Sequence, residues 1–69
     1  MAYEIQFLRY LDGAVRPVVC RQITPASNRL DEVKSEARLT YATTAHFAVA
    51  NGYRVVERSG TVVYLWRED

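Results

Sequence analysis

The sequence predicts an α+β fold of order ββαββ, in which an antiparallel four-stranded sheet made of two hairpins packs on one long central helix. Four segments of strand character are separated in pairs by two turn signals, Asp12-Gly13 and Ser59-Gly60. Between the two hairpins, apolar residues recur at helical spacing. The predicted strands cover residues 3–10, 15–23, 53–58 and 61–66. These elements fit a single small domain, residues 1–69.

The first predicted hairpin turns at Asp12-Gly13, because this dipeptide readily takes the left-handed angles of a two-residue turn. Pairing through that turn would place Phe7 opposite Val18. Pro17 cannot donate a backbone hydrogen bond. We therefore expect the second strand at an edge of the sheet, or bulged at this point.

The helix is predicted to begin after the break at residues 24–29 and to run to about Ala50. Ser27 or Asn28 can cap its first turn, because their side-chain oxygens can accept a hydrogen bond from a free backbone N–H group. Asn51-Gly52 follows as a stop signal, since one of these two residues can adopt the left-handed conformation that ends a helix.

Two stripes of side chains run along the predicted helix. The main stripe, which we expect to cover the sheet, is Leu30, Val33, Ala37, Tyr41, Thr44, Ala45 and Ala48. The weaker stripe, which this packing would leave outside, is Leu39, Ala42, His46 and Val49.

The chain carries few groups suited to catalysis or metal binding. Cys20 is the only cysteine and His46 the only histidine, so neither an internal disulfide nor a cysteine zinc cluster can form. Cys20 falls on the apolar face of the first predicted hairpin, where an inert buried thiol is expected. Isolated glycines offer no phosphate-binding loop. We predict no catalytic residue, no metal and no cofactor, and hence not an enzyme.

Charge and hydropathy patterns favour a cytoplasmic location. Nine Lys and Arg against eight Asp and Glu give a net charge of +1, which draws the chain to neither nucleic acid nor an anionic membrane. The start shows no basic segment followed by an apolar stretch, and no later run approaches a membrane span of ~20 apolar residues. A chain of 69 residues buries only roughly 60% of its unfolded surface, so self-association is a ready source of stability.

Both faces of the second predicted hairpin are apolar. With Ser59-Gly60 as a two-residue turn, one face carries Tyr53, Val55, Val62, Tyr64 and Trp66, and the other carries Arg54, Val56, Val63 and Leu65. Because a helix covers only one face of a sheet, an apolar face is left over, and such faces mark interaction sites. The alternative is that strand twist and the aliphatic stems of Arg54 and Arg58 cover this surplus. We therefore predict a homodimer formed through the outer sheet face, with Tyr64 and Trp66 at its centre.

The predicted partner-binding residues are Tyr53, Tyr64, Trp66, Arg54 and Arg58. The function that we infer is a small non-enzymatic interaction module that binds another protein, for example a phage-type or regulatory inhibitor. The alternative is a nucleic-acid-binding domain, in which sheet aromatics stack on bases and arginines contact phosphates. Arg9 and Arg16, predicted to face each other on the first hairpin, could hold such a phosphate.

The hairpin–helix–hairpin arrangement, with Gly-Tyr-Arg-Val-Val followed by Ser-Gly-Thr-Val-Val, resembles several families of small bacterial and phage proteins. The resemblance covers the whole chain and concerns its architecture. It carries over no functional residue.

Overall fold

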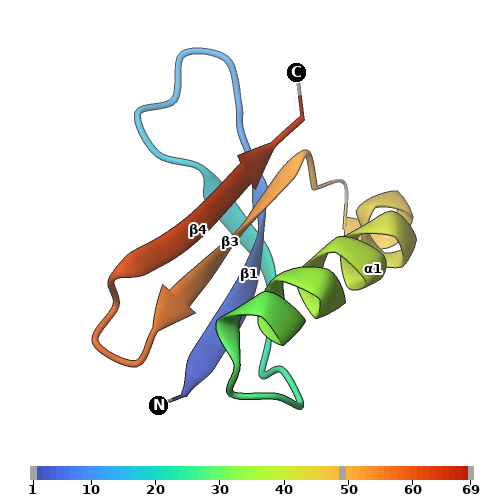
Figure 1. The fold of residues 1–69 in the computed structure, drawn as a ribbon. Coiled ribbons are helices and arrows are strands. Elements are labelled where there is room, and N and C mark those ends of the chain that lie inside the picture. Colours follow the sequence, from blue (N-terminus) through green and yellow to red (C-terminus); the bar gives the residue numbers. More distant parts are fainter. Residues whose placement is uncertain (1, 49, 69) are drawn as a thin grey trace.

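A computed structural model describes the backbone of residues 2–48 and 50–68, and their side chains except those of residues 44–48. The elements are β1 (Tyr3–Arg9), β2 (Val18–Ile23), α1 (Leu30–Ala48), β3 (Gly52–Glu57) and β4 (Val62–Arg67). All neighbouring strands are antiparallel, in the order β2-β1-β3-β4 (Figure 1). The predicted ββαββ order and the four-stranded sheet are confirmed.

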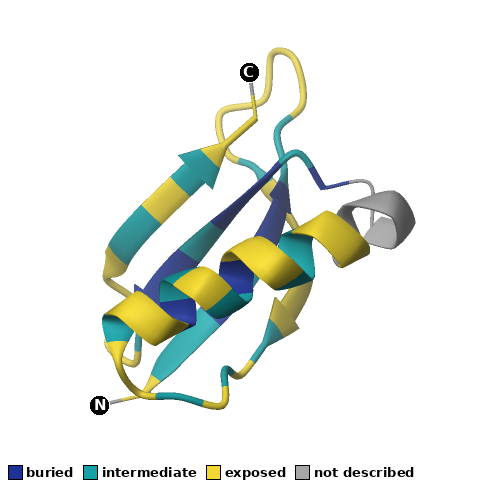
Figure 2. Ribbon diagram, turned by 45° about the vertical axis from the view of Figure 1, so that its right-hand side comes forward, coloured by how far each residue is buried: buried dark blue, intermediate teal, exposed yellow. Residues whose placement is uncertain are grey.

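Helix α1 lies across one face of the sheet and packs chiefly against the two central strands, β1 and β3. Figure 1 shows β4 at the margin of the sheet, with β3 between it and the helix. The buried core between helix and sheet consists of Ile5, Phe7, Val33, Ala37, Ala50, Tyr53 and Val55. Figure 2 shows this burial concentrated under the helix, along the central strands. The strands at both edges are therefore less covered than the centre.

The predicted core face of the helix is confirmed where its side chains are described. Val33 and Ala37 are fully buried, and Leu30 and Tyr41 pack against the same core. Thr44, Ala45 and Ala48 lie outside the described side chains. Of the second predicted stripe, Leu39 is 72% exposed and Ala42 is exposed. The side chain of His46 lies outside the described side chains, and Val49 lies outside the described residues.

Ser27 lies at the predicted start of the helix, and its hydroxyl oxygen accepts a hydrogen bond from the Arg29 N–H at 3.1 Å. The Arg29 carbonyl then accepts from the Val33 N–H at 2.9 Å and begins the helical pattern. α1 ends at Ala48, close to the predicted end at about Ala50. Gly52 does not take a left-handed conformation but is the first residue of β3.

The register predicted for the first hairpin is wrong, although its turn forms. At Asp12-Gly13 the chain turns, with Gly13 at φ +78°, but β2 begins only after Pro17. Phe7 consequently pairs with Arg21 instead of Val18. Since Pro17 has no N–H group to donate, pairing starts beyond it. The expected edge position of this second strand is confirmed by the strand order.

The same shift separates the two arginines that the sequence placed opposite each other. Arg9 pairs with Val18, whereas Arg16 lies exposed in the loop that precedes β2. The pairing also slips between Phe7 and Leu8, where β2 accommodates one extra residue. The predicted Arg9–Arg16 phosphate site does not form.

The second hairpin has a three-residue loop instead of the predicted two-residue turn. The Glu57 N–H donates to the Thr61 carbonyl at 2.8 Å, and Gly60, at φ +92°, donates to the Glu57 carbonyl at 2.8 Å. This pattern is a common hairpin loop that ends on a left-handed glycine. Together with a bulge beside Val56, the extra residue moves Val62 to the outer face and turns Val63 towards the core.

Candidate functional site

Five aromatic rings gather on the helix-facing side of the sheet: Phe7, Tyr41, Tyr53, Tyr64 and Trp66. The Trp66 ring stacks on Tyr53 at 5.4 Å between centroids and meets Tyr41 edge-on at 5.0 Å. Tyr64 lies 6.2 Å from Tyr53 in a tilted arrangement. These separations are those of favourable aromatic pairs, so the rings support one another.

Part of this cluster is open to solvent because α1 covers β1 and β3 more closely than β4. The opening is a hollow of about 330 Å³, which we call the aromatic groove; it is lined by Arg38, Tyr41, Tyr53, Tyr64 and Trp66. Tyr53 forms its floor with only 4% of its surface exposed, whereas Tyr64 and Trp66 are half-buried. The groove thus offers an apolar floor and a half-exposed aromatic wall.

Two cations border the aromatic groove on its helix side. The Lys34 Nζ lies 4.6 Å from the centroid of the Tyr64 ring, a cation–π contact. Arg38, one turn further along α1, is exposed and lines the groove directly. The rim therefore favours an aromatic or anionic group in a partner.

Two phenols of the aromatic groove, those of Tyr41 and Tyr53, stay protonated at neutral pH because their pKa values are raised. Burial, together with a hydrogen bond to Glu68, raises the pKa of Tyr41 to about 12. Its hydroxyl donates at 2.9 Å to Glu68 Oε2 and lies 3.2 Å from the Ala50 carbonyl oxygen. Burial also raises the pKa of Tyr53, with a further contribution from the neighbouring Tyr64. These groups can donate hydrogen bonds but are poor bases.

The structure brings together three of the five predicted site residues, on a different face from the one expected. Tyr53, Tyr64 and Trp66 lie on the side that α1 partly covers, so the assignment of Tyr64 and Trp66 to the outer face is wrong. The cause is physical. Both faces of β4 are apolar, and only the position of the helix decides which of them turns inward.

The two predicted arginines lie elsewhere. Arg54 is on the outer face, where its Nε donates to Gln6 Oε1 at 2.6 Å. Arg58 lies exposed in the β3–β4 loop, and its backbone N–H donates to the Ala2 carbonyl at 3.1 Å. Sequence reasoning missed Lys34 and Arg38 as groove residues. Their spacing relative to Tyr41 places all three on one side of a helix, which could have revealed them.

The outer sheet face is less apolar than predicted. A ladder of hydrogen bonds crosses three strands there, from Arg54 to Gln6 and from Gln6 Nε2 to Gln22 Oε1 at 3.1 Å. Leu8 and Val56 on this face are already buried. The apolar side chains left exposed on the outer face are Val19, Val62 and Leu65, and the last two belong to β4.

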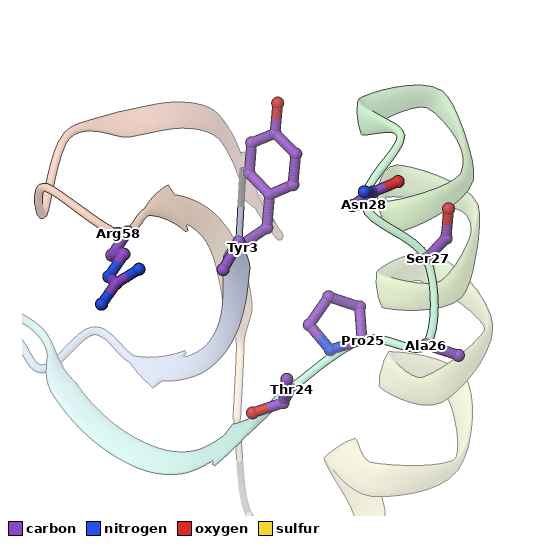
Figure 3. Close-up of a pocket in the computed structure, with 8 residues that line it drawn as sticks. Tyr3, Thr24, Pro25, Ala26, Ser27, Asn28 and Arg58 are labelled. Carbon is purple, nitrogen blue, oxygen red and sulfur yellow. The ribbon is translucent and has the colours of Figure 1, made fainter.

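A larger hollow, of about 590 Å³, lies at the opposite end of the sheet between the β2–α1 loop and the β3–β4 loop. Its lining is Ala2, Tyr3, Thr24, Pro25, Ala26, Ser27, Asn28 and Arg58 (Figure 3). Several of its donors are already engaged, because Thr24 donates to Glu4 and the Ala26 N–H donates to Glu36. We therefore regard the aromatic groove as the better binding site.

Other expected groups contribute no further site among the described residues. Cys20 is half-exposed instead of buried, and its Sγ lies 3.8 Å from the Val18 carbonyl oxygen. Within the described part of the chain, no three Asp, Glu, His or Cys side chains come together as a possible metal site. Over the same residues, no helix has the length and apolar character needed to span a membrane.

No family model, no curated protein and no solved structure matches this chain. Fold and site together define a small ββαββ domain with an aromatic groove beside its helix and a partly uncovered edge strand. Functional inference therefore depends on the chemistry of that region.

Proposed function

We propose that this chain is a non-enzymatic protein-interaction module that forms a homodimer through the region around β4. One observation carries the proposal. Strand β4 is an edge strand with apolar side chains on both of its faces, and α1 packs chiefly on the other strands. Val62 and Leu65 are 45% and 53% exposed on the outer face, while Tyr64 and Trp66 are half-buried on the other.

Strands that are apolar on both faces normally lie inside a sheet or beneath a covering layer. Exposed edge strands normally carry charges, prolines or bulges that discourage pairing with another chain. The opposite edge follows this rule, since Pro17 precedes β2 and Arg21 and Gln22 are exposed along it. Both edges expose apolar side chains, Val18 and Val19 on β2 and Val62 and Leu65 on β4, and both carry a bulge. β4 differs in having half-buried aromatic side chains beside its exposed ones, which supports β4 as the surface that a partner covers.

The groups in the aromatic groove favour binding over catalysis. Phenols with raised pKa values, an indole and a guanidinium can anchor a partner, and aromatic and arginine side chains dominate interface energies. With their raised pKa values, the phenols of Tyr41 and Tyr53 do not act as bases at neutral pH. The unpaired thiol of Cys20 is consistent with the predicted cytoplasmic location. A phage-type or regulatory inhibitor is one role that such a module could fill.

Molar mass in solution, measured by light scattering after size exclusion, tests the proposal. We expect about 16 kDa, twice the chain mass of 7.9 kDa, at micromolar concentrations and at both low and high salt. A mass of 7.9 kDa under every condition would eliminate the homodimer.

Substitutions locate the interface. Leu65→Glu places a charge on exposed β4, and we expect it to weaken association by ~2 kcal/mol or more while the fold is kept. Leu39→Glu is the matched control, because Leu39 is also exposed but lies on α1. Circular dichroism verifies that both variants fold. Equal effects of the two substitutions on mass would argue against β4.

The second candidate, a nucleic-acid-binding domain, is favoured by the cations beside the groove. Lys34 and Arg38 could contact phosphates while bases stack on Tyr64 and Trp66. Fluorescence anisotropy with a labelled single-stranded oligonucleotide tests it. Binding that weakens steeply with salt and disappears in Lys34→Ala would establish this function in place of the first.

A further inference from the structure

We infer that the second copy of this chain pairs with β4 in antiparallel orientation, with Leu65 on the twofold axis, so that two four-stranded sheets join into one of eight strands. This inference rests on the proposed homodimer and specifies how it is built. It follows from which backbone groups β4 presents at its free edge, and from the side chains that the pairing would bring together.

Backbone direction along β4 can be read from its contacts with β3. The Glu68 N–H donates to the Asn51 carbonyl at 2.8 Å, so it points towards the β3 side. The Trp66 carbonyl points the same way, because a Cβ added at Gly52 would lie 2.8 Å from its oxygen. Successive residues of an antiparallel strand point their backbone N–H and C=O groups to opposite edges. The N–H and C=O groups of Leu65 and Arg67 therefore point to the free edge of β4.

Those outward groups are what a second strand requires. An antiparallel pair with Leu65 opposite Leu65 of the partner subunit would form two hydrogen bonds across the axis, one from each N–H. The bulge opposite Val55 and Val56 falls at Val63, which the register skips, so regular pairing on β4 covers residues 64–67. Leu65 lies within this regular segment. An axis at Trp66 would also use outward backbone groups, those of Leu65 and Arg67, so the side chains decide between the two registers.

The side chains favour the same register. With Leu65 on the axis, Tyr64 faces Trp66 of the partner subunit, and this pair occurs twice on the helix-facing side. On the outer side the two Leu65 side chains, each 53% exposed in the single chain, cover one another. Moving the axis to Trp66 would instead place Arg67 opposite Leu65 of the partner subunit, an apolar side chain against a charge.

The symmetry also explains the open aromatic groove. A twofold axis perpendicular to the sheet keeps both α1 helices on the same side. The two grooves then meet across β4 as one aromatic floor between two helices. A standard interface of about 800 Å² per partner is about a sixth of the 4832 Å² surface of this chain, so the strand edge and its flanking side chains must both contribute.

Cysteine cross-linking tests the register. In a Cys20→Ser background, Leu65→Cys places two thiols opposite each other at the Cα separation of ~5.5 Å that a disulfide accepts. With oxidised glutathione as oxidant, we expect a disulfide-linked dimer to form at least tenfold faster than with Leu39→Cys, the exposed control on α1. Non-reducing electrophoresis measures both rates.

A proline tests the backbone direction. Leu65→Pro removes an N–H that points outward, so we expect the chain to keep its fold and dimerise roughly tenfold or more weakly than Leu65→Ala, which retains that N–H. A folded Leu65→Pro that dimerises as tightly as Leu65→Ala would show that this N–H takes no part in the pairing, which overturns the inference.

These outcomes separate the inference from the proposed function. If the wild-type chain is a dimer but Leu65→Cys cross-links no faster than Leu39→Cys, the strand pairing is wrong and the homodimer stands. If the wild-type chain is a monomer at every concentration, the homodimer fails and the strand pairing fails with it.

Discussion

The side-chain amide of Asn51 forms two hydrogen bonds with the backbone of Tyr10: its Oδ1 accepts from the Tyr10 N–H at 2.7 Å, and its Nδ2 donates to the Tyr10 carbonyl at 3.1 Å. The Asn51 backbone adds a bond to the Leu8 carbonyl at 2.8 Å and accepts one from Glu68 at 2.8 Å. One residue thus continues the sheet beyond the ends of β1 and β4, at the point where the chain passes from α1 into β3.

Replacing this amide should destabilise the fold. Asn51→Ala leaves the N–H and C=O of Tyr10 without partners in a partly buried setting, which we expect to cost about 1–3 kcal/mol in the free energy of unfolding. Urea denaturation followed by circular dichroism measures it. Asn28→Ala, at an exposed position, is the matched control and should change stability by less than about 0.5 kcal/mol. Equal losses in the two variants would contradict this role of Asn51.

Gly52 is required for space, not for its backbone angles. A Cβ at this position would lie 2.8 Å from the Trp66 carbonyl oxygen and 3.0 Å from the Tyr10 ring. We expect Gly52→Ala to cost about 1–3 kcal/mol, because a backbone atom cannot move aside cheaply. Thermal and urea unfolding measure the loss.

Gly13 provides the contrast for that prediction. Its Cβ would meet nothing within 4 Å, but its φ of +78° is unfavourable for most side chains. Asparagine tolerates that conformation better than alanine. We therefore expect Gly13→Asn to be more stable than Gly13→Ala, and Gly52→Asn to be no better than Gly52→Ala. The reverse order at either position would overturn its explanation.

The helix and its core face were predictable from the sequence because their signals are local. Val33, Ala37 and Tyr41 repeat at the helical period, and the break before Leu30 supplies a capping serine. The spacing of apolar residues alone therefore indicates which side of the helix is buried.

The hairpin registers and the face of β4 were not predictable by the same reasoning. Register depends on loop length, and neither the late start of β2 after Pro17 nor the left-handed Gly60 is fixed by the turn dipeptide alone. Alternation cannot orient β4, because Tyr64 and Leu65 are both apolar. The aromatic groove exists because α1 packs on β1 and β3, a tertiary relationship that no local pattern shows.

A substitution of Arg54 tests whether the dimer interface is the outer sheet face or the region around β4. Its Nε is held by Gln6 at 2.6 Å, so Arg54→Ala removes a hydrogen bond within the chain. We expect a loss of about 1 kcal/mol in the free energy of unfolding and no change in molar mass by light scattering. A monomeric Arg54→Ala that remains folded would return the interface to the outer face.

Tyr41 should make the fold sensitive to alkaline pH. Its pKa is about 12 in the folded chain, against 10.0 for an unperturbed tyrosine, so the folded state holds the phenolic proton more tightly than the unfolded state does. The stability that this provides is complete below pH 10 and is lost as pH rises from about 10 to about 12. We expect the free energy of unfolding, measured in urea, to fall over this interval, and less steeply in Tyr41→Phe.

Glu68→Gln should lower the pKa of Tyr41, seen by absorbance titration of phenolate, because the carboxylate that disfavours phenolate is gone. Burial, the larger cause, remains in that variant, so a Tyr41 pKa that does not move at all would show that Glu68 plays no part.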